Sequence, residues 1–124
     1  MDPTKIYVDA KVKTHFRKAE IHMELYDFAP PSQPINISAD MPSTSSVFLT
    51  APPGWDKEYH ATPRKQLAVM LVGEATIAAT DGDIIEVGSG DTILLNDQGS
   101  KGHLTQIQGA QDAAFLLIGL DDKN

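Results

Sequence analysis

From residue 46 to residue 120 the chain repeats one pattern, in which short runs of apolar and β-branched residues alternate with turn residues. Each run is about six to eight residues long, the usual length of a strand in a small domain. No segment combines helix caps with an apolar period of 3.6 residues. The pattern therefore predicts an all-β protein built as an antiparallel sandwich or barrel.

The expected strands lie at residues 5–10, 20–28, 46–52, 66–73, 74–80, 83–88, 91–97, 103–109 and 113–120. Turn residues at 81–83 ("DGD") and 88–91 ("GSGD") separate three of them. The segment 29–45 is rich in Pro and Ser and predicts a loop with a short edge strand at 35–37. A chain of 124 residues has the length of one domain. We expect residues 1–44 to pack on a barrel core formed by residues 45–124.

Composition excludes several classes of protein. The net charge of −7 argues against nucleic acid as a partner. The absence of cysteine excludes disulfides and a thiol nucleophile. The start "MDPTKIYVDAKVK" has no apolar core of a signal peptide, and no run approaches the length of a membrane span. These features predict a cytoplasmic protein without a membrane partner.

The stretch 54–73 ("GWDKEYHATPRKQLAVMLVG") holds polar residues just before an apolar strand. Alternate side chains of a strand share a face, so His60, Thr62 and Gln66 should point into the same interior as Ala68 and Met70. Leu67, Val69 and Leu71 should face the other way and are also apolar. Both faces of this strand therefore need cover. Polar residues at the mouth of an apolar interior are typical of a small-molecule site.

The same stretch resembles the first motif of the cupin superfamily: Gly, five residues, His-x-His, three or four residues, Glu, six residues, Gly. Here the motif reads Gly54, "WDKEY", His60-Ala61-Thr62, "PRK", Gln66, "LAVMLV", Gly73. The second cupin motif is altered: Gly90 and "DTILL" are followed by "NDQGSKGH", which ends at His103. The resemblance covers roughly residues 45–120 and implies a single-domain jelly-roll β-barrel.

Metal-binding cupins use the motif histidines and the glutamate to ligate one divalent ion. Carried over to this chain, the ligands would be His60, Gln66 and His103, with Thr62 in place of the usual second histidine. Imidazole ligands suit Mn, Fe, Ni or Zn. A neutral amide leaves the ion's charge uncompensated, which weakens metal binding and favours an anionic substrate. The alternative is a metal-free site in which these side chains hydrogen-bond a ligand or one another.

Four further residues are candidates for substrate binding: Trp55, Tyr59, Arg64 and Met70. The planar guanidinium of Arg64 could clamp a carboxylate, and the alternative for it is solvent exposure. Trp55 and Tyr59 precede His60 and could line the pocket or cap the barrel. Asp97, in the loop before His103, could orient that imidazole or act as a base, with loop solvation as the alternative.

Two functions fit these residues. One is a divalent-metal-dependent enzyme that acts on a small carbonyl or carboxylate substrate by lyase, isomerase or oxygenase chemistry. The other is a metal-free binding or sensing protein that uses the same pocket for a small molecule. The apolar face of Leu67, Val69 and Leu71 also predicts a homodimer, with the strands at 5–10 and 20–28 as candidate cover.

Overall fold

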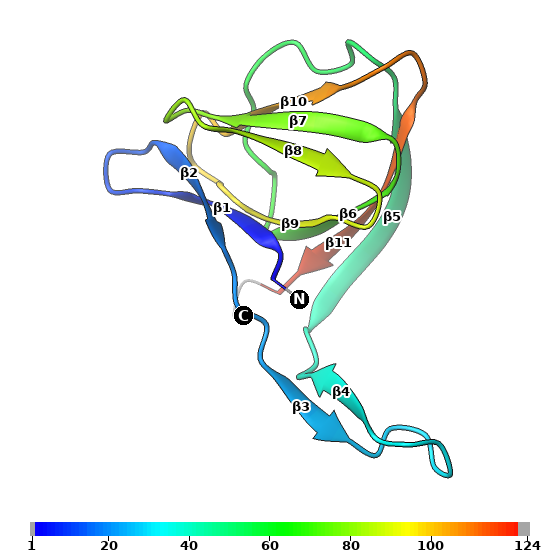
Figure 1. The fold of residues 1–124 in the computed structure, drawn as a ribbon. Helices are drawn as coiled ribbons and strands as arrows, with labels where there is room; N and C mark the ends of the chain where they lie inside the picture. The colour runs from blue at the N-terminus through cyan, green and yellow to red at the C-terminus, as the bar shows by residue number, and fades with distance from the viewer. Residues whose placement is uncertain (1, 122–124) are drawn as a thin grey trace.

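The computed structural model describes residues 2–121, and its regular structure consists of strands alone (Figure 1). The all-β prediction is therefore confirmed. No helix in these residues is long and apolar enough to cross a membrane. The strands are β1 Thr4–Val8, β2 Thr14–Lys18, β3 Met23–Tyr26, β4 Ile35–Ser38, β5 Ser43–Ala51, β6 Gln66–Val72, β7 Glu74–Ala79, β8 Ile84–Gly88, β9 Thr92–Asn96, β10 His103–Ile107 and β11 Ala113–Leu120.

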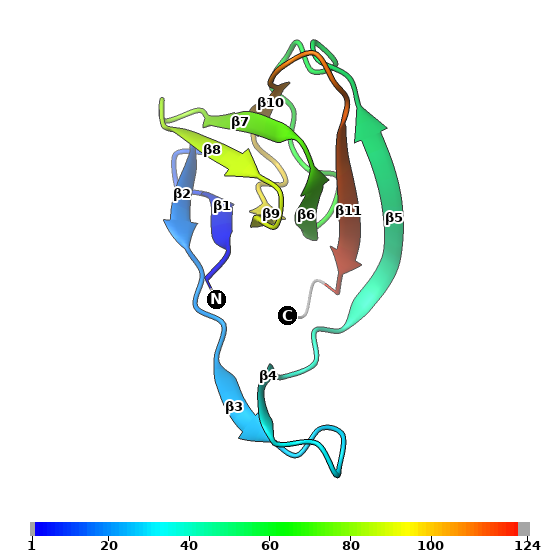
Figure 2. The same ribbon diagram turned by 45° about the vertical axis from the view of Figure 1, so that its right-hand side comes forward.

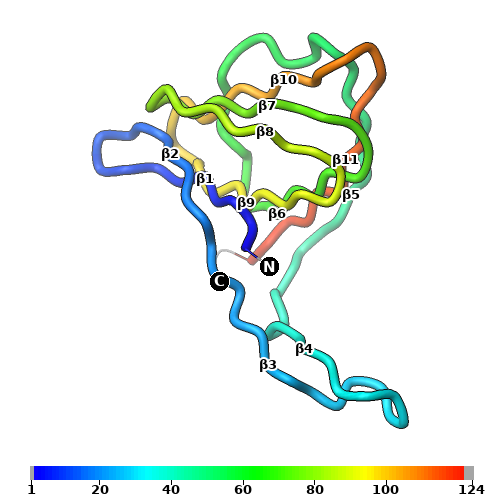
Figure 3. The backbone as a smooth tube through the Cα atoms, viewed as in Figure 1, coloured from blue at the N-terminus to red at the C-terminus, as the bar shows by residue number. Residues whose placement is uncertain are grey.

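Two sheets enclose the core. The larger sheet has six strands in the order β2-β1-β9-β6-β11-β5, and the smaller has three in the order β10-β7-β8. All neighbours are antiparallel except β1 and β9, which run parallel. Figure 3 shows the N-terminal β1 beside β9, a pair far apart in the sequence. The core between the sheets includes Ile6, Met70, Ile77, Ile93 and Phe115.

The two sheets meet at corners instead of closing into one hydrogen-bonded barrel. β6 passes directly into β7 through Gly73, whose φ of +101° is a conformation that side chains rarely adopt. A side chain there would also approach Ala113 to 3.1 Å. Among residues 2–121, no strand ladder joins the six-stranded to the three-stranded sheet. The expected closed barrel is therefore replaced by two facing sheets.

The N-terminal segment differs most from expectation. Residues 14–18 form β2, which was not expected because "THFRK" is mostly polar. Thr14 is nevertheless buried and Phe16 packs on the core, so the strand alternates between inward and outward residues. β3 and β4 pair with each other and form a separate two-stranded sheet, which we call the arm. The arm extends away from the two larger sheets, whereas β1 and β2 belong to the six-stranded sheet (Figures 1 and 2).

His15 links the two larger sheets through a pair of carboxylates. Its Nε2 lies 2.6 Å from Asp9 in the β1–β2 turn, and its Nδ1 lies 2.9 Å from Asp81 in the β7–β8 turn. The hydrogen bond to Asp9 is the main cause that raises the pKa of His15. The same bond lowers the pKa of Asp9. A protonated imidazole can donate from both nitrogens at once, which fits this bridge.

These shifts predict how His15 affects stability at different pH values. A raised folded-state pKa means that the stabilisation from His15 is fully present below the ordinary histidine pKa and is lost as pH rises through the raised value. The lowered pKa of Asp9 means that the stabilisation from this carboxylate is lost only at low pH, as the pH falls through the lowered pKa. His15→Gln should therefore reduce the free energy of unfolding at about pH 5.5 and have little effect at about pH 9. Urea unfolding at both pH values measures this. His22→Gln, at an exposed histidine, is the control, and an equal loss from His15→Gln at both pH values would contradict the assignment.

Candidate functional site

His60 and His103 are brought together by their backbones. His60 lies in the segment between β5 and β6, and His103 begins β10. Each residue donates its amide hydrogen to the carbonyl of the other, with N···O distances of 3.0 Å in both directions. The two imidazole centroids are 5.3 Å apart. The candidate ligands of the two sequence motifs therefore form one pair of neighbouring rings.

Gly102 makes this close pairing possible. Its φ is +80°, and a Cβ added to it would lie 2.0 Å from the carbonyl oxygen of His60. That contact is with backbone, which cannot move aside without breaking the pairing of His60 with His103. A residue without a side chain is therefore required beside the pair.

Asp97 fixes the ring of His103. Asp97 is fully buried, and its Oδ2 lies 2.6 Å from Nδ1 of His103. Its Oδ1 accepts the amide hydrogen of Thr62 at 2.9 Å. Because a carboxylate oxygen accepts, Nδ1 of His103 carries the hydrogen and Nε2 is left for a ligand. Of the interpretations of Asp97, the structure supports orientation of the imidazole and excludes loop solvation.

His60 has a similar but looser support. Its Nδ1 lies 3.2 Å from Oδ1 of Asp56, whose side chain is largely buried. The other oxygen of Asp56 accepts the amide hydrogen of Thr105 at 2.9 Å, which ties this carboxylate to β10. Asp56 is not among the residues expected at the site. Its position four residues before His60, within the first motif, is the only signal that points to it.

An apolar cavity of about 240 Å³ opens beside these rings. His60, His103, Thr62 and Gln66 supply polar groups at its wall, and Trp55 contacts His60 edge-on with ring centroids 5.8 Å apart. The remaining lining is largely apolar and comes from both sheets and the segment before β6: Leu49, Ala51, Pro63, Ala68, Ile77, Ile93, Leu95, Thr105, Phe115 and Leu117. The cavity thus combines an apolar body with polar groups, as small-molecule sites commonly do.

Gln66 is held by Thr62. The Thr62 hydroxyl donates to the carbonyl of Arg64 at 2.6 Å and lies 3.3 Å from Oε1 of Gln66. A hydroxyl has one hydrogen, which the Arg64 carbonyl already accepts, so the contact with Gln66 is better satisfied when the amide is turned over and its NH₂ faces Thr62. The amide oxygen of Gln66 is then the atom offered to a ligand.

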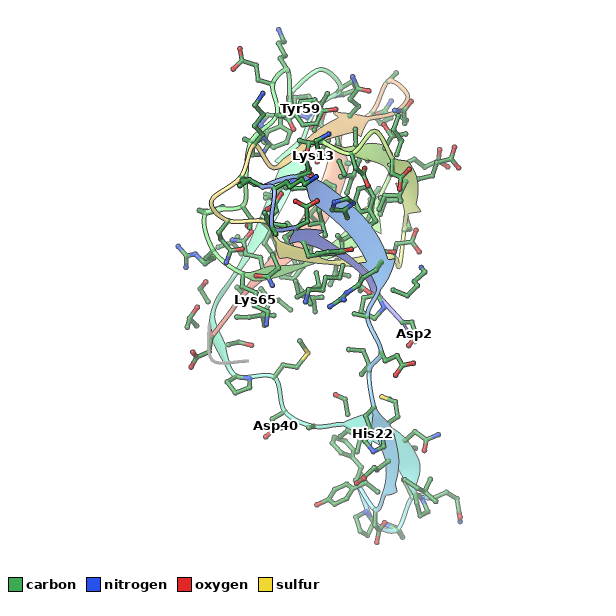
Figure 4. All side chains as sticks on the ribbon, turned by 90° about the vertical axis from the view of Figure 1, so that its left-hand side faces the viewer. Asp2, Lys13, His22, Asp40, Tyr59 and Lys65 are labelled. Carbon is green, nitrogen blue, oxygen red and sulfur yellow. The ribbon has the colours of Figure 1, made fainter. Side chains whose placement is uncertain are left out.

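The four candidate substrate-binding residues are placed differently. Trp55 lines the cavity, whereas Tyr59, Arg64 and Met70 are not among the described residues that do. Met70 is fully buried in the core, and the exposed Arg64 is directed toward Ser45, with 3.5 Å between Nη1 and Oγ. Figure 4 shows Tyr59 at the end of the two sheets that lies away from the arm.

Metal ligands are fewer here than in most metal centres. No three His, Cys, Asp or Glu side chains within residues 2–121 cluster in a way that could hold an ion. The available donors are the two imidazoles and the amide of Gln66. Nδ1 of His103 is tied to a carboxylate, an arrangement common for metal-bound histidine, whereas Nδ1 of His60 lies near both the Asp56 carboxylate and the Glu58 carbonyl. The donor set fits a weakly held divalent ion or a ligand hydrogen-bonded directly to the rings.

Comparisons with known proteins give little further guidance. No known protein family matches the chain, and no curated protein matches it in sequence. One similar solved structure is described as a "putative ethanolamine utilization protein q" from Salmonella typhimurium LT2. The two are 14% identical, and the likeness covers 97% of this chain and 95% of the other, with a TM-score of 0.40. A superposition this loose carries no argument about the function of this chain.

Proposed function

We propose that this protein is a cupin-like protein that binds a small molecule in the cavity beside His60 and His103. The observation that carries the proposal is the orientation of these rings. Nδ1 of His103 is bonded to Asp97, and Nδ1 of His60 lies 3.2 Å from Asp56 and 3.4 Å from the carbonyl of Glu58. This arrangement supports Nε2 of each ring as the atom offered to a ligand at the wall of the apolar cavity. Two oriented imidazoles side by side can hold one polar head group while the apolar walls cover the rest of the molecule.

The chemistry of the rings defines the ligand class. A neutral imidazole accepts a hydrogen bond at Nε2, and a protonated one donates from it. A hydroxyl or enol fits the first state, and a carboxylate or carbonyl oxygen fits the second. Polar groups distributed along the walls, which a sugar would need, are few in this lining. Small aromatic or aliphatic carboxylates and ketones therefore suit the cavity best.

Metal-dependent catalysis is the second candidate. It is favoured by the carboxylate-supported imidazoles, with His60, Gln66 and His103 as the ligands of one Mn, Fe, Ni or Zn ion. A bound ion would supply polarisation of a substrate oxygen, as lyases, isomerases and oxygenases require. The role of this chain's residues would be to orient the ligating nitrogens and to cover the substrate with apolar walls.

A melting-temperature screen tests the proposed ligand class. Benzoate, hexanoate and acetophenone should raise the melting temperature, whereas glucose and AMP should not. A ligand at 100 times its Kd stabilises the native state by about 2.7 kcal/mol, roughly 10 °C for a chain of this size. The shift should be lost in His60→Ala and His103→Ala and retained in His22→Ala, which alters a histidine on the arm side of the molecule. Shifts with sugars alone, or shifts that persist in both cavity variants, would place the site elsewhere.

The same assay separates the two candidates when it is repeated with Mn²⁺, Ni²⁺ and Zn²⁺. If the ion binds as proposed for the enzyme, Gln66→Glu should enlarge the metal-induced shift because a carboxylate is a stronger ligand than an amide. Carboxylate-induced shifts that do not depend on added metal would favour the metal-free binding protein.

A further inference from the structure

The N-terminal hairpin of β1 and β2 reaches the cavity site through Thr14. This residue begins β2 and is fully buried. Its hydroxyl donates to the carbonyl of Gly102 at 2.8 Å, across 88 residues of sequence. Gly102 is the residue whose lack of a side chain allows His60 and His103 to pair. A strand outside both sequence motifs therefore contacts the backbone of the site directly.

The contact from Thr14 fixes one particular peptide unit. The carbonyl of Gly102 and the amide of His103 belong to the same planar group, so the direction of one sets the direction of the other. That amide donates to the carbonyl of His60 at 3.0 Å. The amide of Gly102 is held separately by Oγ of Ser100 at 2.9 Å, within the loop that leads to β10. Thr14 thus controls the tilt of the peptide that joins the two histidine segments.

Thr14 is itself held by the β7–β8 turn. The amide of Thr80 donates to the Thr14 hydroxyl, and the amide of Thr14 donates to the Thr80 hydroxyl, both at 2.8 Å. The amide of Asp81 donates to the Thr14 carbonyl at 3.3 Å. The two hydroxyls lie 3.1 Å apart, and Thr80 is the donor there because the one hydrogen of the Thr14 hydroxyl is given to Gly102. The Thr14 hydroxyl therefore has one defined direction.

The next residue, His15, fastens the start of β2 to the same turn. Its imidazole bridges Asp9 of the β1–β2 turn and Asp81 of the β7–β8 turn. The ring also stacks on Tyr7 of β1, with centroids 5.5 Å apart. A shift of the start of β2 would break this bridge together with the hydrogen bonds of Thr14. The hairpin therefore presents Thr14 to Gly102 from a fixed position.

We infer that Thr14 is a positioning residue of the cavity site, which acts through the Gly102–His103 peptide on the arrangement of His60 and His103 and so on ligand affinity. Thr14 is not among the described residues that line the cavity. Figure 4 shows its neighbour Lys13 at the same end of the two sheets as Tyr59, the neighbour of His60. The effect on affinity rests on the proposed function, whereas the effect on the rings does not.

Imidazole NMR of the ligand-free protein, followed by benzoate titration, tests the role of Thr14. Thr14→Val keeps the shape of the side chain but removes the hydroxyl, so it should shift the ring signals of His60 and His103 and raise the benzoate Kd by about tenfold or more. Thr14→Ser restores the hydroxyl and should bring the Kd back to within about threefold of wild type. Thr80→Val is the matched control, because it removes a hydroxyl from the same cluster and leaves the bond from Thr14 to Gly102 in place. It should move the ring signals and the Kd far less.

A folded Thr14→Val protein whose ring signals and Kd change no more than those of Thr80→Val would overturn the inference. If Thr14→Val does not fold, His15→Gln decides, because it loosens the start of β2 and retains the Thr14 hydroxyl. At about pH 5.5 it should shift the ring signals of His60 and His103, whereas His22→Gln should not; unchanged signals in His15→Gln would then overturn the inference. Ring signals that respond to Thr14→Val in a protein that does not bind benzoate would support the role of Thr14 and contradict the proposed function.

Discussion

Replacing Asp97 by alanine should destabilise the protein by about 3 kcal/mol and abolish ligand binding in the cavity. The carboxylate is fully buried and accepts hydrogen bonds from His103 and from the amide of Thr62. Its removal leaves two buried donors without an acceptor, and each such donor costs about 1–3 kcal/mol. His103 also loses the contact that keeps its hydrogen on Nδ1. Urea unfolding and the melting-temperature screen measure the two effects.

Asp97→Asn separates stability from orientation. An asparagine side chain has the same shape, and its oxygen can still accept from Thr62. Its NH₂ group would donate to Nδ1 of His103 and move the ring hydrogen to Nε2. We expect a smaller loss of stability than with alanine and a smaller loss of benzoate binding, because a hydrogen on Nε2 can still be donated to a carboxylate. Asp83→Ala, in the exposed β7–β8 turn, is the control for loss of a carboxylate. A loss of benzoate binding as large as in Asp97→Ala would mean that the ligand does not accept a hydrogen bond from Nε2 of His103.

Gly102→Ala should also be severely destabilising, by more than about 3 kcal/mol. A side chain at a φ of +80° costs about 1–2 kcal/mol, and the added Cβ would lie 2.0 Å from the backbone oxygen of His60. Relief of that contact requires separation of His60 from His103, with loss of two hydrogen bonds worth about 1 kcal/mol each. The free energy of unfolding and the ligand-induced shift should therefore fall together.

Gly109→Ala is the matched control for this substitution. Gly109 has a φ of +77°, but an added Cβ meets nothing within 4 Å. Gly109→Ala should lower the free energy of unfolding only by the cost of a side chain at positive φ, about 1–2 kcal/mol, and should retain ligand binding. The difference between the losses in free energy of unfolding of the two variants measures what the contact between the added Cβ and the His60 carbonyl costs. Equal losses in both would mean that the His60–His103 pairing is not as tight as the structure shows.

Strand parity predicted much of the cavity wall. Gln66 and Ala68 share the inward face of β6, and the preceding His60 and Thr62 join them at the cavity despite Pro63. Parity alone could not separate core from cavity along that strand, since both are apolar: Ala68 lines the cavity, whereas Met70 is sealed in the core. Arg64 and Tyr59 lie in irregular segments, where alternation does not apply.

Other features depend on contacts between distant segments. Asp56 supports His60 while it binds the amide of Thr105, a pairing set by the position of β10. The strand β2 is polar in sequence because only its inner face, with Thr14 and Phe16, is buried. The strand at 20–28 was expected to cover the apolar outer face of residues 66–73, but local sequence does not show where a strand finds its partner. Such features follow from tertiary geometry and not from periodicity.

The central claim is that His60 and His103 present their Nε2 atoms to one ligand, and NMR of the ring nitrogens tests it most directly. The chain has four histidines, so His15 and His22 serve as internal controls. On titration with benzoate, the Nε2 signals of His60 and His103 should shift together while their Nδ1 atoms remain protonated, and the signals of His15 and His22 should stay in place. If benzoate raises the melting temperature while neither cavity ring responds, or while only His15 or His22 responds, the account of the site is contradicted.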